Sequence, residues 1–181
     1  MPNADAYPAE LLARAAKIRL ACFDVDGTLT DGRLYFDADG RESKAFHVLD
    51  GQGLVLLRKS GIEVALVTAR DSASAAHRAR DLGVRGHVGV HDKLGTVQAL
   101  ATELGIALEH VAFMGDDLPD LGVMRAVGFA VAPANAHPWT REHAHWCTTA
   151  RGGEGAAREL CDLLLVAQGR VDALLSQAGA P

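Results

Sequence analysis

Ile18-Arg19-Leu20-Ala21-Cys22-Phe23-Asp24-Val25-Asp26-Gly27-Thr28 is the stretch that decides the fold of this chain. A mostly apolar run ends in two aspartates and a glycine, which is typical of a buried strand followed by a loop. In an open α/β sheet, ligands bind at the carboxyl ends of the strands. Burying a carboxylate without a partner is costly, so a pair of them needs compensation. A hard cation can provide it, and the stretch therefore predicts a metal-assisted carboxylate site.

The composition is that of an ordinary globular protein. The chain has 181 residues, enough for one sizeable core, and we expect a single domain over residues 1–181. A formal net charge of −5 argues against a nucleic-acid surface, which needs a basic face. Three cysteines without metal-type spacing favour a reducing compartment. No apolar run has the length of a membrane span, and the N-terminus does not resemble a signal peptide, so a cytoplasmic location is predicted.

Short apolar runs alternate with helical patterns along the chain. The predicted strands are 18–23, 62–67, 88–90, 111–114, 127–131 and 146–148, and the predicted helices are 9–16, 50–61, 72–82, 94–104, 119–126, 134–144 and 156–167. Such alternation implies a mostly parallel sheet that helices cover on both faces. We therefore expect an α/β fold, a Rossmann-like three-layer sandwich, with a frayed C-terminal tail at about 169–181.

A β-hairpin insertion is predicted after the first strand, at about 32–48. The segment Asp37-Ala38-Asp39-Gly40 separates two β-prone stretches, 34–36 and 44–48, and Asp-Gly at such a place is a hairpin signal. An isolated hairpin is marginal in water, and its free edges invite pairing. We therefore expect this hairpin to pack on another subunit; the alternative is that it folds back on its own domain.

Polar side chains gather where the predicted strands end. They are Asp24 and Asp26 after the first strand, Thr68 and Arg70 after the second, Lys93 after the third, and Asp116, Asp117 and Asp120 after the fourth. Because these ends share one edge of a parallel sheet, the side chains can converge. Phosphoryl transfer needs a nucleophile, an acid for the leaving oxygen, and cations that neutralise phosphate charge. The set favours a phosphatase in which a carboxylate attacks phosphorus and forms an acyl phosphate.

The segment Asp24-Val25-Asp26-Gly27-Thr28 resembles the first motif of the haloacid-dehalogenase-like phosphatases. Thr68, Lys93 and Gly115-Asp116-Asp117 match the second, third and fourth motifs of that superfamily in order. The resemblance implies that Asp24 is the catalytic nucleophile and that Asp26 is the general acid and base.

The same resemblance implies the ligands of the site. Thr68 and Lys93 would bind the phosphate, and Thr28 would contact the substrate. The ligands of Mg²⁺ would be the Asp24 carboxylate, the backbone carbonyl of Asp26 and Asp116, with Asp117 or Asp120 in support. For Asp120 a structural alternative stays open, because a carboxylate also stabilises a helix N-terminus through the helix dipole.

Further segments resemble the 3-deoxy-D-manno-octulosonate 8-phosphate phosphatases, over roughly residues 17–168. These segments are Thr30-Asp31-Gly32, Phe46–Gly53, Gly115–Asp120, Ala134–Pro138 and Arg151–Ala156. That family is capless, and this chain likewise leaves no room for a cap domain between the first motif and the next helix. The family forms homotetramers in which the hairpins assemble and a neighbouring subunit helps to close the site.

This second resemblance also implies an activity. It is the Mg²⁺-dependent hydrolysis of 3-deoxy-D-manno-octulosonate 8-phosphate to the free sugar acid and phosphate, through an aspartyl-phosphate intermediate, in bacterial lipopolysaccharide synthesis. One departure is Thr68-Ala69-Arg70, where Thr-Gly-Arg is usual in the family. The threonine is kept, and an added methyl group matters only if the backbone there needs a positive φ.

Alternatives stay open for two arginines and for the substrate. Arg70 either binds the carboxylate or phosphate of the substrate in bidentate fashion or forms a surface ion pair. Arg151, in its Gly-rich loop, either grips an acidic sugar in a neighbour's site or remains solvated. The alternative functions are a phosphatase for a nine-carbon sugar acid phosphate, a broad phosphomonoesterase, and a non-catalytic oligomerisation domain. Intact Asp24 and Lys93 argue against the last of these.

Overall fold

Strands and helices alternate along the chain, and the computed structural model describes residues 4–179. The strands are β1 Leu20–Phe23, β2 Tyr35–Phe36, β3 Glu42–Ser43, β4 Glu63–Val67, β5 Arg85–His87, β6 Val111–Met114, β7 Phe129–Ala132 and β8 Trp146–Cys147. The α-helices are α1 Ala9–Ala15, α2 Val48–Lys59, α3 Ala73–Leu82, α4 Lys93–Glu103, α5 Leu121–Ala126, α6 Pro138–Arg141, α7 Ala156–Ala167 and α8 Val171–Gln177. Three 3-10 turns complete the list: η1 Ala4–Ala6, η2 Leu108–His110 and η3 Leu118–Asp120.

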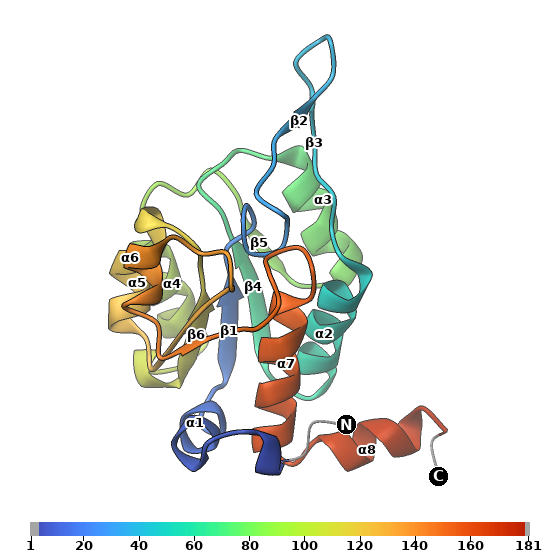
Figure 1. Ribbon diagram of the computed structural model, residues 1–181, viewed down its shortest axis with the longest axis vertical. Coiled ribbons are helices and arrows are strands. Elements are labelled where there is room, and N and C mark those ends of the chain that lie inside the picture. Colours follow the sequence, from blue (N-terminus) through green and yellow to red (C-terminus); the bar gives the residue numbers. More distant parts are fainter. Residues whose placement is uncertain (1–3, 180–181) are drawn as a thin grey trace.

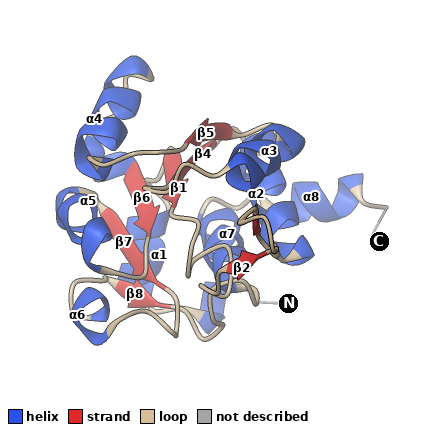
Figure 2. Cartoon of the chain, turned by 90° about the horizontal axis from the view of Figure 1, so that it is seen from above, coloured by secondary structure: helices blue, strands red, loops and turns tan. Residues whose placement is uncertain are grey.

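Six parallel strands form the central sheet, in the order β5-β4-β1-β6-β7-β8. Helices lie on both faces of this sheet (Figures 1 and 2). The predicted α/β sandwich is therefore confirmed. Within residues 4–179, no helix combines the length and the apolar character that a membrane span requires.

The central strand β1 is buried on both faces. Ala21 and Phe23 face one part of the core, which α1, α2, α3 and α7 complete, whereas Leu20 and Cys22 face the other part, beneath α4 and α5. All four side chains are fully buried. This double burial is why the strand reads as a continuous apolar run rather than as an alternating pattern.

The register of the sheet brings the strand ends to a common edge. Phe23, the last residue of β1, pairs with Leu66 of β4 on one side and with Met114 of β6 on the other. The backbone N–H of Asp24 then donates to the Met114 carbonyl over 2.9 Å, so the pairing continues into the first motif. Residues that follow these three strands therefore begin side by side.

The hairpin stands away from the sheet, at the top of Figure 1. Strands β2 and β3 pair antiparallel, and the Asp37 carboxylate closes the turn by accepting the N–H groups of Asp39 and Arg41. The predicted second strand, 44–48, is wrong: the pairing ends at Ser43, and α2 already begins at Val48. The hydrogen bonds of Asp37 close a short turn, and the strand that follows it therefore pairs early, with Glu42 opposite Phe36.

Three other predictions need correction. The third strand is Arg85–His87 rather than 88–90, because Gly83 ends α3 at a φ of +65° and the chain enters the sheet directly afterwards. The predicted helix 134–144 is reduced to α6, which begins at a proline. The tail predicted to be frayed contains α8, whose Val171 and Leu174 pack against the main core.

A buried aspartate joins α2 to the start of α7. Asp50 is 2% exposed, and its carboxylate accepts the backbone N–H groups of Gly155 (3.3 Å) and Arg158 (2.8 Å). Burial raises the pKa of Asp50, although these hydrogen bonds act in the opposite direction. The contact fixes the end of the Gly-rich loop before α7 relative to α2.

Candidate active site

Asp24 directly follows the last residue of β1 in the chain, and its side chain is almost entirely buried. Its partner is Lys93, the first residue of α4, whose Nζ donates to Asp24 Oδ1 over 2.7 Å and to Asp120 Oδ1 over 2.6 Å. Asp92 caps α4 by accepting the Gly95 N–H, which fixes where the helix begins and therefore where Lys93 lies. Although burial opposes its charge, the two carboxylates raise the pKa of Lys93.

Asp120 organises the loop that follows β6. Its Oδ2 accepts the backbone N–H of Asp116 (3.0 Å) and that of Asp117 (3.3 Å). A Cβ atom on Gly115 would lie 2.4 Å from Asp120 Cγ, so this close approach requires glycine. Asp117 itself is exposed and accepts the Leu118 N–H over 2.8 Å. The structure thus places Asp120 inside the site, as a partner of Lys93 and of the loop backbone, and leaves Asp117 at the surface.

Asp116 packs against the loop of the first motif. Gly27 has a φ of +87°, and a Cβ atom there would lie 2.1 Å from Asp116 Oδ2. A side chain at position 27 would therefore displace Asp116. This explains in physical terms why a glycine follows the second aspartate of the first motif.

Three carboxylates meet in this part of the structure. Oxygen atoms of Asp24, Asp116 and Asp120 lie within 4.8 Å of one another. Burial, together with the charge of Asp120 and against the effect of Lys93, raises the pKa of Asp24 to about 6. Burial and the charges of Asp24 and Asp120 raise the pKa of Asp116 to about 8.

The charge of this cluster fits a divalent cation. Three carboxylates against the single ammonium of Lys93 leave two uncompensated negative charges when all three acids are ionised. Oxygen ligands of this kind are those that Mg²⁺ prefers. After burial, repulsion among the carboxylates is the next cause of the raised pKa values of Asp24 and Asp116, and a bound cation would relieve the same repulsion.

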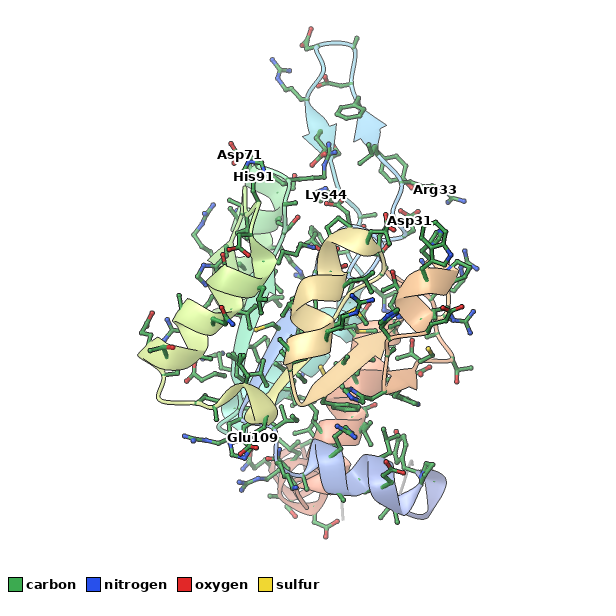
Figure 3. All side chains as sticks on the ribbon, turned by 90° about the vertical axis from the view of Figure 1, so that its left-hand side faces the viewer. Asp31, Arg33, Lys44, Asp71, His91 and Glu109 are labelled. Carbon is green, nitrogen blue, oxygen red and sulfur yellow. The ribbon has the colours of Figure 1, made fainter. Side chains whose placement is uncertain are left out.

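Asp26 is not a member of this carboxylate cluster and contacts the hairpin. Its Oδ1 accepts a hydrogen bond from Lys44 Nζ, and Lys44 also pairs with Glu42 over 2.9 Å. Lys44 lies at the base of the hairpin (Figure 3). Sequence reasoning missed both Glu42 and Lys44. Their spacing of two residues, which places two side chains on one face of an extended chain, was the available signal.

Arg70 lies beside the same pair. Its Nε and Nη2 donate to Glu42 Oε2 over 3.0 and 2.6 Å, and Ser72 Oγ donates to Glu42 Oε1 over 3.1 Å. Arg70 Nε is 4.0 Å from Asp26 Oδ2. In this structure Arg70 therefore has an ion-pair partner, and its side chain remains 42% exposed.

The two threonines are enclosed by the strand ends. Thr68 follows β4, is buried, and its Oγ1 accepts the Arg70 N–H over 3.3 Å. Thr28 is fully buried, and its Oγ1 has no hydrogen-bond partner among the described residues. Thr68 thus lies on the same sheet edge as Asp24, because β4 and β1 are adjacent.

The Gly-rich loop before α7 covers the first motif through its backbone. Gly152 N–H donates to Asn135 Oδ1 over 2.6 Å, and Gly153 N–H donates to the Thr28 carbonyl over 3.1 Å. A Cβ atom on Gly152 would lie 1.8 Å from the Gly27 carbonyl oxygen. Arg151, at the start of this loop, is exposed. The loop is therefore held close to the site, while its arginine faces solvent.

Comparison with known proteins agrees with this geometry. The family model described as haloacid dehalogenase-like hydrolase matches residues 87–160. The 3-deoxy-D-manno-octulosonate 8-phosphate phosphatase KdsC of Escherichia coli K12 is 44% identical over 94% of this chain and 91% of its own length.

Solved structures are similar as well. A hypothetical protein from Xanthomonas campestris has a TM-score of 0.95 at 60% identity, covering 98% of each chain. A 3-deoxy-D-manno-octulosonate 8-phosphate phosphatase from Moraxella catarrhalis, solved with a magnesium ion, a phosphate ion and the sugar acid KDO, has a TM-score of 0.91 at 42% identity, covering 94% of this chain and 99% of its own. This chain belongs to the 3-deoxy-D-manno-octulosonate 8-phosphate phosphatase family of haloacid dehalogenase-like hydrolases.

Proposed function

We propose that this chain hydrolyses 3-deoxy-D-manno-octulosonate 8-phosphate to the free sugar acid and inorganic phosphate, with Mg²⁺ as cofactor. The observation that carries the proposal is the buried contact of Asp24 with Lys93, beside Asp116 and Asp120, at the carboxyl edge of the sheet. These contacts support the proposal because they bring together the proposed nucleophile, a cation and the carboxylates proposed to bind the metal ion, from the segments after β1 and β6 and from the start of α4. The Moraxella relative was solved with the ion, the phosphate and the sugar of this reaction.

The proposed roles of the residues are those that the family resemblance implies. Asp24 attacks phosphorus, while Asp26 gives a proton to the leaving sugar oxygen and later takes one from the attacking water. Lys93 has three N–H groups and uses two of them on Asp24 and Asp120, so one is left for a phosphate oxygen. Thr68, buried on the same edge, is the proposed second phosphate ligand.

The proposed ligands of the metal ion are the Asp24 carboxylate, the backbone carbonyl of Asp26 and Asp116. When bound, the ion supplies electrostatic stabilisation to the transferring phosphoryl group. Asp120 acts in support, because it holds Lys93 and the loop that carries Asp116. Asp117, which is exposed, is the weaker candidate for that role.

We propose that two exposed arginines recognise the carboxylate of the sugar acid. Arg70 and Arg151 are exposed cations at or near the mouth of the site, and a guanidinium suits a carboxylate. Thr28, enclosed under the loop, is proposed to support the phosphate end. A nine-carbon sugar acid phosphate carries the same two anionic ends and is the rival substrate.

We further propose that the active form is a homotetramer in the cytoplasm. The hairpin exposes Leu34 (47%), Tyr35 (43%) and Phe36 (56%), an apolar surface that a second copy would cover. Free thiols at Cys22, Cys147 and Cys161 suit a reducing compartment. The hairpin would then complete the site of a neighbouring subunit.

The experiment that tests the activity is phosphate release from a panel of sugar phosphates, with Mg²⁺ and with a chelator. We expect the highest kcat/KM for the eight-carbon keto-acid phosphate and no turnover without the metal ion. Higher activity on the nine-carbon sugar acid phosphate would replace the substrate. Equal activity on simple phosphomonoesters would remove the claim of specificity.

A further inference from the structure

We propose that Lys44, carried by the hairpin, is a positioning residue that orients the carboxylate of Asp26 toward the leaving oxygen of the substrate. The inference rests on the proposed phosphatase function and adds a residue to it. Lys44 would make the hairpin part of the reaction chemistry as well as of subunit assembly.

The burial of Lys44 is the first argument. Its side chain is 1% exposed, although it belongs to a hairpin that otherwise projects into solvent. A lysine is rarely buried so completely unless its charge is paired, because desolvating an ammonium is costly. Its Nζ is paired with two carboxylates, those of Asp26 and Glu42. The residue proposed as general acid is therefore paired with a buried cation.

The two oxygens of Asp26 are the second argument, because they have different surroundings. Oδ1 accepts the hydrogen bond from Lys44, whereas Oδ2 is buried and has no hydrogen-bond partner in the part of the chain described. A buried oxygen without a partner is costly and calls for an explanation. Oδ2 is the atom left to exchange a proton with the substrate, since Oδ1 is held.

Arg70 supplies the third argument. Its Nε lies 4.0 Å from Asp26 Oδ2, just beyond hydrogen-bond distance, and Glu42 holds the guanidinium through two shorter bonds. Without Lys44, Arg70 would be the cation that remains beside the Asp26 carboxylate. Lys44 and Glu42 together keep the acid and the arginine apart.

The step that depends on this orientation is the first half of the reaction. The bond between phosphorus and the sugar oxygen breaks as a bond forms between phosphorus and an Asp24 oxygen. The proton on Asp26 moves to the sugar oxygen, which leaves as an alcohol. A misplaced Asp26 therefore slows substrates whose leaving group needs a proton and spares those whose leaving group does not.

The test compares two substrates in wild type and Lys44→Met. The quantity is kcat/KM, which includes leaving-group departure but not the later hydrolysis of the acyl phosphate. For the sugar phosphate, whose leaving group is an alkoxide, we expect a loss of about 10²-fold or more, the usual contribution of general acid catalysis. For p-nitrophenyl phosphate, whose leaving group departs as a stabilised anion, we expect a loss of less than about threefold.

Arg41→Met is the matched control, because it removes a hairpin cation that is 76% exposed and pairs with Asp37 and Asp39 at the tip. It should leave both rates unchanged. Equal losses on both substrates in Lys44→Met would assign Lys44 to folding alone, and unchanged rates on both would remove any role; either result overturns the inference.

The outcome also separates this inference from the proposed substrate. If wild type fails on the eight-carbon sugar phosphate but hydrolyses another alkyl phosphate, the proposed substrate is wrong, and the comparison proceeds with that alkyl phosphate. If wild type is active on the eight-carbon substrate and the two losses are equal, only the role of Lys44 is wrong.

Discussion

The strand-end site and the hairpin are built in opposite ways. Asp24, Lys93 and Asp120 are buried charges that hold one another at the edge of a fully buried sheet. The hairpin instead exposes apolar side chains, Phe36 most of all, on a two-stranded ribbon with little support. The proposed reaction centre is thus held by contacts within one chain, whereas the apolar surface of the hairpin is one that we propose a second copy covers.

Lys44 connects the two regions, since it is buried although it comes from the hairpin. The base of the hairpin therefore contacts the first motif at Asp26, in addition to the assembly role that we propose for its exposed strands.

The largest effect on activity should come from Asp24→Asn, which removes the proposed nucleophile at the end of β1. We expect kcat to fall by about 10⁴-fold or more, the scale seen when a catalytic nucleophile is removed. The fold should be retained, because the change relieves repulsion among three clustered carboxylates. Phosphate release and urea unfolding measure the two quantities. Asp39→Asn, at the hairpin tip, is the control, and phosphate release by Asp24→Asn at the wild-type rate would end the proposal.

A second large effect should come from Lys93→Met. The variant leaves Asp24 and Asp120 buried without their shared cation, so the metal-free protein should lose about 3–5 kcal/mol of unfolding free energy. Urea unfolding with and without Mg²⁺ measures the loss and how much of it the ion restores. Lys59→Met, at the exposed end of α2, is the control, and equal unfolding midpoints for the two variants would contradict the account.

The third effect is the pH dependence of the stability of the metal-free protein. The pKa values of Asp24 (about 6) and Asp116 (about 8) are raised above the ordinary value of 3.8. The folded state therefore binds protons more tightly than the unfolded chain, so its stability without metal should fall as pH rises through this range.

If Mg²⁺ binds these carboxylates as proposed, protons compete with it, so the increase in Tm on adding Mg²⁺ should be larger near pH 8 than near pH 5. Thermal unfolding at the two pH values measures it. An increase that is larger at the lower pH would mean that the ion binds elsewhere.

The smallest effect on the subunit fold should come from the hairpin double variant Leu34→Ser with Phe36→Ser. Both residues are exposed, so we expect the far-ultraviolet circular dichroism of the variant to be unchanged. The proposed tetramer should dissociate, which light scattering measures as a lower mass. Trp139→Ser, at an equally exposed residue on α6, is the control, and a variant that keeps the wild-type mass would exclude the hairpin as the assembly surface.

Sequence patterns predicted the central sheet and the polar residues at its strand ends much better than they predicted the hairpin. Burial on both faces makes strands such as β1 and β6 appear as apolar runs, and the polar residues behind them mark the sheet edge. The edge strand β5 was misplaced because its residues, Arg85 to His87, carry no apolar signal.

The contacts of the hairpin could not be predicted from local patterns. Lys44 and Glu42 look like ordinary surface charges in sequence, and only the path of the chain over Asp26 gives them partners. Contacts between side chains that are far apart in the sequence leave no periodic pattern from which they could be predicted. The role of Asp120 was left open for the same reason, since its bond to Lys93 spans 27 residues.

The most direct test of the central claim is a rapid acid quench of the wild-type enzyme during turnover of the eight-carbon sugar phosphate with Mg²⁺, followed by peptide mass spectrometry. We expect one added phosphoryl group on the peptide that contains Asp24, and none in Asp24→Asn. A phosphoryl group on another residue, or steady turnover by Asp24→Asn, would contradict the claim that this carboxylate is the nucleophile.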